Sequence, residues 1–416
     1  MSKLEELIQK LCPNGVEYKT FEDFSIQLTG MSGVYNKWAE TGNCVFIDYM
    51  NAYTHLKIDT TLIKKATVKN LRQTILQKGD ILFTSASEVP DECAISSVIE
   101  NDIQDGVFLD DHLFGIRILE KYRTEINSTF LNYYFRGIEF RKIVQKAVRG
   151  VTRFYISKKD FMKIKIPIPP IEVQEEIVRI LDKFTELTAE LTAELTARKK
   201  QYEFYRDELL NVENRIKNVE WKALCEVCDI VDYRGKTPKK TKSGIFLVTA
   251  KNIRKGYIDY EKSQEYISVE DYNTVMRRGF PKIGDILITT EAPCGNVAQV
   301  DRENIALAQR VIKYRSKSDL LSNDFLKYIL LGKTFQDKLQ IAASGGTVKG
   351  IKGSRLHKLM IPIPSIEEQK RIVSILDRFD KLCNDISEGL PAEIDARQKQ
   401  YEYYRDKLLT FEEIAQ

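Results

Sequence analysis

The sequence contains a long internal repeat, and this feature constrains the fold more than any other. Residues 166–184 recur as residues 361–379, an offset of 195, and both copies open with Ile-Pro-Ile-Pro. Residues 198–210 recur as 397–409 at an offset of 199, so the second copy is four residues longer between the two matched runs. A repeat of this length predicts one architecture built twice along the chain.

The two copies agree only in part. Gly79-Asp-Ile-Leu matches Gly284-Asp-Ile-Leu, but the sequences between such anchors have little in common. A duplicated frame with divergent interiors indicates one task performed on two different targets. With 416 residues, of which 43% are hydrophobic and 30% charged, the chain is too long for one core and has a globular composition.

Each copy changes character at its Ile-Pro-Ile-Pro run. Upstream, short β-branched and aromatic runs such as 44–47 and 285–289 lie between glycine turns and predict strands. Downstream, apolar residues recur at steps of three and four from Ile177 to Leu209, with no internal Pro or Gly, and predict a helix of about 40 residues. The expected fold class is α+β, with two mixed α/β domains separated by two long helices. The expected boundaries are 1–169 and 214–364 for the domains, and 170–213 and 365–416 for the helices.

The two long helices are expected to pair with each other. Ile177, Phe184 and Leu191 are spaced by seven, and the second copy repeats the pattern with Ile372 and Phe379. In a chain that alternates globule and helix, we expect an antiparallel coiled coil and a pseudo-twofold molecule. The alternative is an apolar stripe that packs only on its own globule, but a helix of about 60 Å is longer than such a domain.

The ends of the helices carry local signals. Pro170 can occupy the first turn of the first helix without losing a useful N–H, and Ser365-x-x-Glu368 is a capping-box pattern at the start of the second. Gly389-Leu-Pro391 is expected to interrupt the second helix near its middle.

A tandem Thr-Ala-Glu-Leu repeat lies inside the first helix, between Phe184 and Arg198. One four-residue unit lengthens a helix by about 6 Å and turns it by about 400°, so adding a unit rotates the distal half by only about 40°. The segment can therefore act as an adjustable ruler. The alternative is an ordinary helix rich in Ala, Glu and Leu.

Composition and motifs exclude several function classes. The net charge is only +4, and none of the three histidines has metal-ligand spacing. Cys225-x-x-Cys228 lacks a second Cys or His pair, so a zinc site is not expected, and seven thinly spread cysteines indicate reduced thiols. No glycine-rich nucleotide motif is present, and no apolar run is long enough for a bilayer, so we expect a soluble, cytoplasmic protein.

Together, the two divergent globules, the near-identical helices ending in Tyr-Arg-Asp, and the Thr-Ala-Glu-Leu repeat resemble the specificity subunit of type I restriction-modification enzymes over the whole chain. The resemblance implies a non-catalytic subunit whose two target recognition domains each read one half of an asymmetric, bipartite DNA site. It implies double-stranded DNA, two modification subunits and restriction subunits as partners. S-adenosylmethionine, ATP and magnesium are expected on those partner subunits, and no cofactor is expected in this chain.

The candidate DNA contacts follow from the distribution of charge. Residues 149–165 hold six basic residues and one acid, and residues 342–360 hold four basic residues and no acid, at the same place in the repeat. The run 233–240 is a further candidate in the second copy, and polar residues after predicted strands, at 249–254 and 84–87, are weaker ones. The alternative for each is a solvated surface or an ordinary turn. The candidate residues are Arg149, Thr152, Arg153, Lys158, Lys159, Arg234, Lys236, Thr237, Lys251, Asn252, Thr347, Lys349, Lys352 and Arg355.

Two other function classes remain open from the residues alone. One is a protein-interaction adaptor with two coiled-coil arms that binds no DNA. The other is a catalytic chain, for which the sequence offers little. Salt-dependent binding to duplex DNA distinguishes a subunit that reads DNA from such an adaptor.

Overall fold

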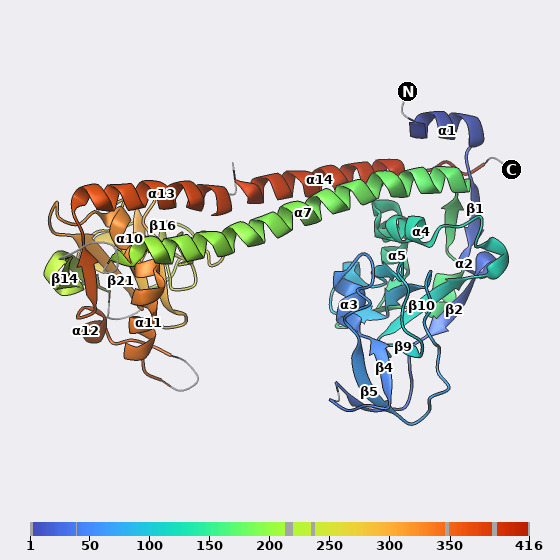
Figure 1. The fold of residues 1–416 in the computed structure, drawn as a ribbon, viewed down its shortest axis with the longest axis horizontal. Helices are drawn as coiled ribbons and strands as arrows, with labels where there is room; N and C mark the ends of the chain where they lie inside the picture. The colour runs from blue at the N-terminus through green and yellow to red at the C-terminus, as the bar shows by residue number, and fades with distance from the viewer. Residues whose placement is uncertain are drawn as a thin grey trace. The chain divides into compact units, whose positions relative to one another are not determined.

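The structure is a computed structural model that describes residues 3–38, 40–212, 219–233, 238–345, 349–384 and 389–414. It divides into two compact units (Figure 1). Unit 1 consists of Met1–Leu191 with Ile394–Gln416, and unit 2 consists of Thr192–Glu393. Each unit therefore contains one globule, the first part of the helix that follows it, and the last part of the other copy's helix.

The first long helix, α7, runs without interruption from Ile171 to Leu210 and is 40 residues long, as the apolar spacing predicted. The second long helix was predicted to cover 365–416 with an interruption at Gly389-Leu-Pro391, and the structure confirms the interruption but ends the helix at Leu408. It has two helices, α13 (Ile366–Asn384) and α14 (Leu390–Leu408). Pro391 lies in the first turn of α14, where the missing N–H costs no hydrogen bond, so a new helix begins at the predicted interruption.

The chain leaves the helix after α14 because its backbone finds other partners. The Val16 N–H donates to the Glu412 carbonyl at 2.8 Å, and the Ile414 N–H donates back to the Val16 carbonyl at 3.2 Å. The Tyr18 hydroxyl also donates to the Phe411 carbonyl at 3.0 Å. These bonds hold the C-terminal tail of the described chain in an extended conformation against the start of unit 1.

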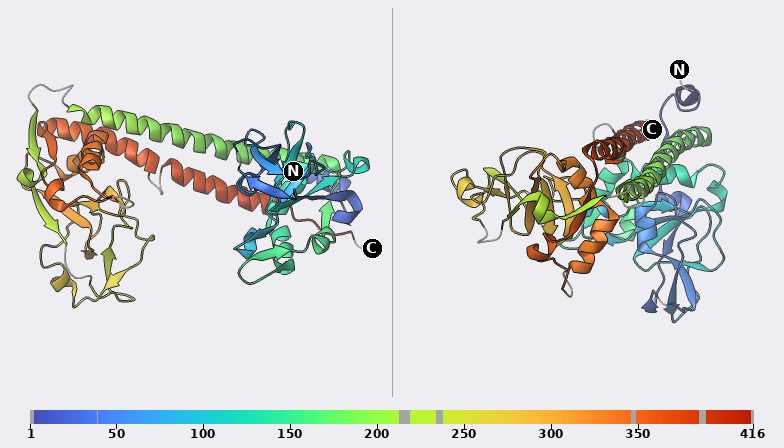
Figure 2. Two further views of the ribbon diagram at one scale, coloured as in Figure 1. Left: turned by 90° about the horizontal axis from the view of Figure 1, so that it is seen from below. Right: turned by 60° about the vertical axis from the view of Figure 1, so that its left-hand side comes forward.

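Aromatic contacts join the paired helices inside each unit. In unit 1, Phe184 of α7 stacks on Tyr404 of α14 with 5.4 Å between ring centroids. In unit 2, Phe379 of α13 lies 6.5 Å from Tyr202 and 6.0 Å from Tyr205 of α7. The paired helices run in opposite directions (Figures 1 and 2), which confirms the antiparallel coiled coil. The helices also pack on the globules, since Ile177 and Ile372 are fully buried in the two main cores.

Each globule is built on an antiparallel four-stranded main sheet. The strand order β2-β10-β6-β8 in unit 1 matches the order β15-β21-β18-β19 in unit 2. The strands of unit 1 are β2 (Ser25–Thr29), β10 (Leu113–Ile118), β6 (Ile81–Thr84) and β8 (Ser96–Val98). Those of unit 2 are β15 (Cys228–Asp232), β21 (Val311–Ser316), β18 (Ile286–Thr290) and β19 (Cys294–Gln299).

A second sheet completes each globule. In unit 1 its order is β3-β5-β4-β9, and in unit 2 it is β17-β16-β20, with β4 parallel to β9 and β16 parallel to β20. The strands of unit 1 are β3 (Val34–Lys37), β5 (Lys64–Val68), β4 (Cys44–Ile47) and β9 (Val107–Leu109). Those of unit 2 are β17 (Tyr266–Ile267), β16 (Ile245–Val248) and β20 (Ile305–Leu307).

A two-stranded pair connects each globule to its long helix. β1 (Glu17–Thr20) pairs antiparallel with β13 (Lys165–Ile168), and β14 (Glu220–Ala223) pairs in the same way with β22 (Met360–Ile363). The Ile-Pro-Ile-Pro runs thus form β13 and β22, which lead directly into α7 and α13. Ser365 caps α13 by accepting a hydrogen bond from the Glu368 N–H at 3.3 Å, as its sequence pattern predicted.

The remaining helices are short and surround the sheets. In unit 1 they are α1 (Lys3–Leu11), α2 (Phe21–Phe24), α3 (Tyr49–Thr54), α4 (Ser128–Arg136), α5 (Ile138–Ala147), α6 (Lys158–Met162) and the 3-10 turns Pro90–Glu92 and Glu120–Tyr122. In unit 2 they are α8 (Leu224–Val227), α9 (Tyr272–Val275), α10 (Asn323–Leu331), α11 (Lys333–Ala342) and α12 (Gly353–Leu356). All seven cysteines are free.

A buried ion pair shows how closely the two frames agree. Asp80 and Asp285, which follow the matched glycines of the Gly-Asp-Ile-Leu runs, are almost fully buried. Both oxygens of Asp80 accept from Arg117 at 2.7 Å, and those of Asp285 accept from Arg315 at 2.5 and 2.6 Å. Because removing one partner would leave a buried charge unpaired, this interaction fixes the same turn against the same strand in both units.

Candidate DNA-binding surfaces

The basic segment of unit 1 forms a hairpin followed by a short helix. β11 (Val148–Arg149) pairs with β12 (Phe154–Ile156), which in turn pairs with β7 (Ala86–Ser87). Gly150 at the turn has a φ of 120°, and a side chain there would come within 2.1 Å of the Arg153 carbonyl. The turn therefore requires glycine, and it leaves Thr152 and Arg153 exposed at the tip.

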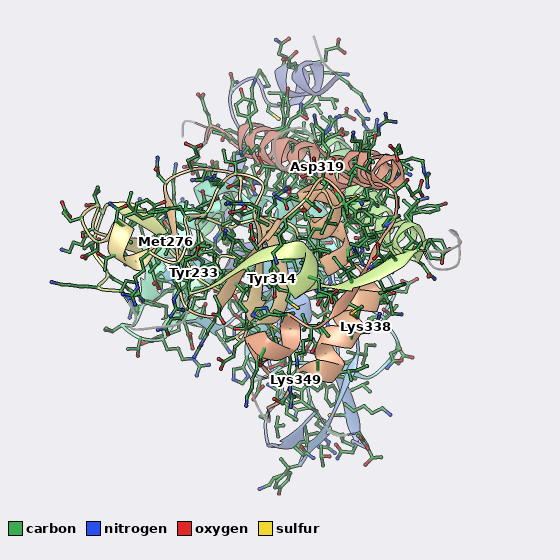
Figure 3. The ribbon with its side chains drawn as sticks, turned by 90° about the vertical axis from the view of Figure 1, so that its left-hand side faces the viewer. Tyr233, Met276, Tyr314, Asp319, Lys338 and Lys349 are labelled. Atoms are coloured by element: carbon green, nitrogen blue, oxygen red, sulfur yellow. The ribbon has the colours of Figure 1, made fainter. Side chains whose placement is uncertain are left out.

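Unit 2 builds the same hairpin in the same register. Arg149 opposes Tyr155 in unit 1, and Ser344 opposes Gly350 in unit 2. Each residue of the second pair lies 195 positions after its counterpart in the first pair. Gly345 has a φ of 133°, like its counterpart in unit 1. Lys349 leads into the return side of this hairpin and is exposed (Figure 3). The predicted match between the two basic segments is therefore a match between two hairpins.

Apart from Lys163 and Lys358, the basic residues of the two segments do not occupy equivalent positions. Lys352 holds the position before α12 that Ser157 holds before α6, where Ser157 accepts a hydrogen bond from the Asp160 N–H at 3.3 Å. Arg355 stands at the position of Asp160. The two units thus share a backbone but present different charges on it, as expected of surfaces that meet different targets.

The candidate DNA-binding residues of unit 1 differ in whether they already have partners within the protein. Arg149 forms an ion pair with Asp160 at 3.1 Å, and the Lys158 ammonium lies 5.9 Å from the Phe114 ring centroid. Lys159 is exposed on α6. Arg153 lies at the tip of the turn, and the structure shows no acidic partner for it among the described residues. Arg153 is therefore the cation of this hairpin best placed to meet a phosphate.

Asn252 was predicted to contact DNA, and the structure contradicts this. The residue is fully buried, and its amide nitrogen donates to the carbonyls of Asp259 and Ser263, both at 2.9 Å. Its amide oxygen accepts from the N–H and the hydroxyl of Thr249 at 2.9 and 2.8 Å. Every hydrogen-bonding position of the Asn252 amide is thus used inside the loop, while neighbouring Lys251 remains exposed.

The polar residues at 84–87 also mainly form hydrogen bonds within the protein. Thr84 is fully buried, donates to the Glu92 carbonyl at 2.9 Å and accepts from the Ile95 N–H at 2.9 Å. The Ser87 hydroxyl donates to the Glu92 carboxylate at 2.8 Å. Four other candidates, Arg234, Lys236, Thr237 and Thr347, lie outside the described residues.

Two carboxylates and a histidine in unit 1 have the composition of a metal site but already bind a lysine. Asp110, Asp111 and His112 lie close together, and the Lys37 ammonium contacts all three, at 2.8 Å from Asp110 and 2.9 Å from His112. Burial lowers the pKa of Lys37, but its hydrogen bonds to Asp110 and Asp111 outweigh this effect, so the pKa is raised. A lysine that stays charged takes the place of a metal cation here.

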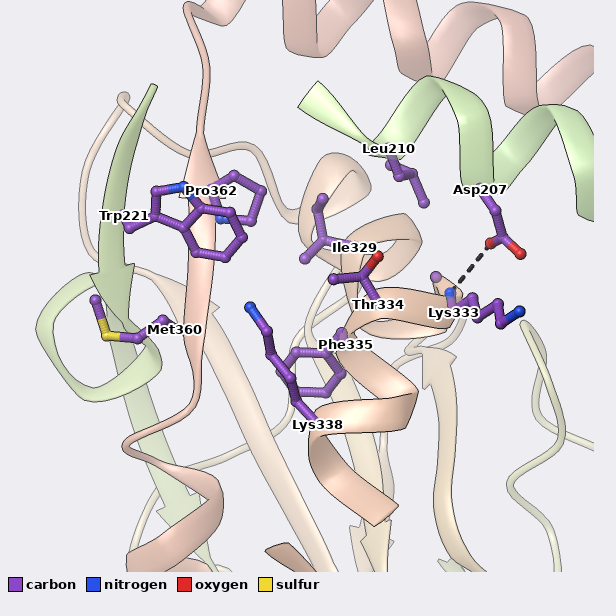
Figure 4. A pocket seen from close by; sticks show the side chains of 11 residues that line it. Asp207, Leu210, Trp221, Ile329, Lys333, Thr334, Phe335, Lys338, Met360 and Pro362 are labelled. Carbon is purple, nitrogen blue, oxygen red and sulfur yellow. Dashed lines mark hydrogen bonds between the residues drawn. The ribbon is translucent and has the colours of Figure 1, made fainter. Parts of the chain in front are cut away.

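A pocket in unit 2 is lined by residues of the strand pair β14–β22 and of the neighbouring helices, and not by residues of the hairpin. Trp221, Met360 and Pro362 form one wall, and α11, with Lys338 facing Trp221 at 4.2 Å, forms another (Figure 4). Tyr18 takes the place of Trp221 in unit 1, where its hydroxyl binds the tail carbonyl of Phe411.

The described helices include none that is both long and apolar enough to cross a membrane. The sequence model described as "Type I restriction modification DNA specificity domain" matches residues 30–198 and 216–396, which covers most of both copies.

Two curated relatives agree with this match. The specificity subunit of the EcoR124I/EcoR124II type I restriction enzyme of Escherichia coli is 41% identical over 283 residues, which span 62% of this chain and 66% of that protein. A putative type I restriction enzyme specificity subunit of Haemophilus influenzae is 36% identical over 302 residues, or 70% of this chain and 74% of that one. The first alignment thus covers just under two thirds of the relative.

Solved structures share the fold. One solved chain comes from work on the structural basis of complex assembly and conformational transition of the type I R-M system. It aligns over 96% of this chain and 98% of its own length, with a TM-score of 0.60 and 17% identity. The S subunit of a type I restriction-modification system from M. genitalium aligns over 95% and 96%, with a TM-score of 0.50 and 14% identity. With both copies of its repeat matched, the chain belongs to the family of type I restriction modification DNA specificity domains, the non-catalytic specificity component of these systems.

Proposed function

We propose that this chain reads a bipartite, asymmetric DNA site, with each unit recognising one half-site. The observation that carries the proposal is a pair of matched hairpins, in which Arg149 opposes Tyr155 in unit 1 and Ser344 opposes Gly350 in unit 2, so that they share a register and carry different side chains. Two recognition units that share a backbone construction but differ in their surface side chains suit two unlike half-sites. Phosphate contacts from exposed cations such as Arg153 and Lys352 would fix the register on the duplex, and other side chains would read base edges.

We further propose that the chain acts within a larger complex. Its partners would be two modification subunits, which methylate adenine, and restriction subunits, which translocate and cut DNA. S-adenosylmethionine, ATP and magnesium would then bind to those partners and not to this chain. The duplicated frame supports two equivalent docking places, because the same strand pair and helix junction occur once in each unit.

The test is to map methylated adenines in DNA from cells that make this chain together with its modification partner. The proposal expects one motif with two unlike specified parts separated by unspecified pairs. A palindromic or continuous motif would contradict two different readers. If the purified complex shows no salt-dependent binding to duplex DNA, the chain is an adaptor and not a reader.

A further inference from the structure

Three strands of the second sheet of unit 1, β5, β4 and β9, correspond to β17, β16 and β20 of unit 2, although their sequences show no such match. β5 and β17 each pair antiparallel with the strand that precedes them, β4 and β16. Asn51 of unit 1 also repeats the role of Asn252, because its amide donates to the carbonyls of Asp59 and Leu62 at 2.8 and 3.3 Å. The loops after β4 and β16 are therefore built on the same buried asparagine.

This correspondence identifies a segment of unit 1 that charge counting alone overlooked. The basic run 233–240 follows β15, and Thr241 then bridges to Tyr266 of β17. In unit 1, residues 30–33 follow β2, and β3 then pairs with β5. In the order of the chain, β3 of unit 1 thus corresponds to Thr241 of unit 2, since each lies between the first strand of the main sheet and the loop of the second sheet and each contacts the strand that follows β4 or β16.

Strand β3 forms the edge of its sheet, and one large aromatic side chain is exposed on the strand and a second directly after it. Tyr35 is 67% exposed and lies where the pairing with β5 is interrupted by a bulge between Val34 and Asn36. Trp38 is 56% exposed and has a φ of 70°, a left-handed conformation that is uncommon for a large side chain. Aromatic residues held outward by a bulge and a strained backbone are typical of a binding surface.

Several positive charges lie around these aromatic residues, and exposed Glu40 follows two residues after Trp38. Residues 60–79 hold five basic residues and no acid. The Lys69 ammonium lies 4.9 Å from the Tyr35 ring centroid, and Lys64 opposes Phe46, whose ring lies 6.0 Å from that of Trp38. Within the described part of the chain, Lys64, Lys69 and Arg72 have no acidic partner, and the nearby acids Asp110 and Asp111 are bound by Lys37.

We propose that Tyr35, Trp38, Lys64, Lys69 and Arg72 form a surface, here called the β3 edge, that contacts the DNA half-site read by unit 1. This inference rests on the proposed function and names residues for it. The three cations match the charge of a duplex backbone and bind phosphates, which gives a salt-dependent contribution. Tyr35 and Trp38 contact base edges in a groove, since the major groove is wide enough for a strand edge.

The experiment uses the complex of the full chain with its modification partner, bound to a duplex that carries the wild-type site. Replacing Lys64, Lys69 and Arg72 by Gln one at a time is expected to weaken binding. Each replacement is also expected to lower the slope of log affinity against log salt by up to about 0.9, because one phosphate is then no longer neutralised. Lys78→Gln is the matched control, because Lys78 lies in the same basic run but already pairs with Asp102 at 3.6 Å.

The aromatic residues are tested by the sequence of the methylated motif. Tyr35→Ala and Trp38→Ala are expected to cost roughly tenfold in affinity and to relax one half-site while the other stays unchanged. Tyr35→Phe keeps the ring and is expected to keep most of the contact. Assembly with the modification partner, measured in the same samples, shows that each variant is folded.

Two outcomes would overturn the inference, and they are distinguishable. If the wild-type complex binds its site but the variants keep both salt slope and motif, the β3 edge does not contact DNA and the proposed function stands. If the wild-type complex shows no sequence-dependent binding, the proposed function fails and the inference fails with it.

Discussion

The carboxylate of Asp406, in the last turn of α14, accepts a hydrogen bond at 3.0 Å from the backbone N–H of Ile138, the first residue of α5 and 268 positions earlier in the chain. Asp207 of α7 does the same in unit 2 for Lys333, the first residue of α11, at 3.1 Å. The residue before each short helix is a glycine, which has no side chain for a cap. Each long helix therefore supplies the cap of a helix in the other copy's globule.

Removing this cap should loosen the first turn of α5. Asp406→Ala is expected to cost about 1 kcal/mol locally, because an N–H of α5 loses its acceptor and the helix N-terminus loses a nearby negative charge. Amide hydrogen exchange at Ile138 should then be several times faster. Asp395→Ala is the control, since Asp395 lies on the same helix but pairs only with exposed Lys399. Equal protection of Ile138 in both variants would argue against the cap.

The two hairpins should contribute separately to DNA binding. Arg153→Ala and Lys352→Ala are each expected to weaken binding across all sequences and to lower the salt slope by about 0.9, because each removes one phosphate contact. Lys142→Ala, whose lysine pairs with Glu139 at 2.9 Å on α5, serves as the control. Titrations of one duplex at several salt concentrations provide the measurement. Unchanged slopes in both variants would mean that these residues are only solvated.

The Thr-Ala-Glu-Leu repeat should set the spacing of the DNA site. One more unit after Leu195 adds about 6 Å and about 40° to α7 and changes no residue of either globule. Since DNA rises about 3.4 Å per base pair along one strand, the methylated motif should keep both half-sites and gain one to two unspecified pairs. A two-residue insertion should be far worse, because a turn of about 200° would expose the buried Tyr202 and Leu210. An unchanged spacing would show that the helix is not the ruler.

The contact between α1 and α7 should depend on acid pH. Hydrogen bonds from Arg179 and from Lys3 lower the pKa of Glu176 to about 2. A carboxylate with a lowered pKa stabilises the fold above its ordinary pKa of 4.5, and this stability is lost as the pH falls from there toward 2.

Urea unfolding compared between the wild type and Glu176→Gln tests this. The difference between their midpoints should be largest near pH 7 and should shrink below pH 4, because the wild-type side chain is then progressively neutralised. A difference that stays constant down to pH 3 would mean that the ion pairs do not stabilise the contact.

Sequence reasoning predicted the frame well because its signals are local. The length of α7, the strand runs 44–47 and 285–289, and the cap at Ser365 all follow from residues that are neighbours in the chain. It missed the end of the second helix, because the tail partners, Val16 and Tyr18, lie almost 400 residues away.

The candidate site was predicted less well, because exposure is not a local property. Arg153 and Asn252 look equally suitable as polar residues in loops, yet one is exposed at a turn and the other is fully buried with its amide saturated. The β3 edge was missed although residues 60–79 contain no acid, because its aromatic residues lie in an earlier segment of the chain than its cations and only strand pairing brings the two segments together.

By itself the sequence determined that one architecture occurs twice, that long amphipathic helices follow each globule, and that the family is one of specificity components. Periodicity and repetition are written along the chain, so no long-range contact is needed to find them. Only the tertiary structure decided that Asp406 and Asp207 each cap a helix of the other copy's globule, and that three strands of each second sheet match without sequence identity. These features depend on which groups, distant in the chain, meet in the fold and on which side chains remain outside the core. Backbone hydrogen bonds preserve the pairing of two strands even when the side chains of those strands change.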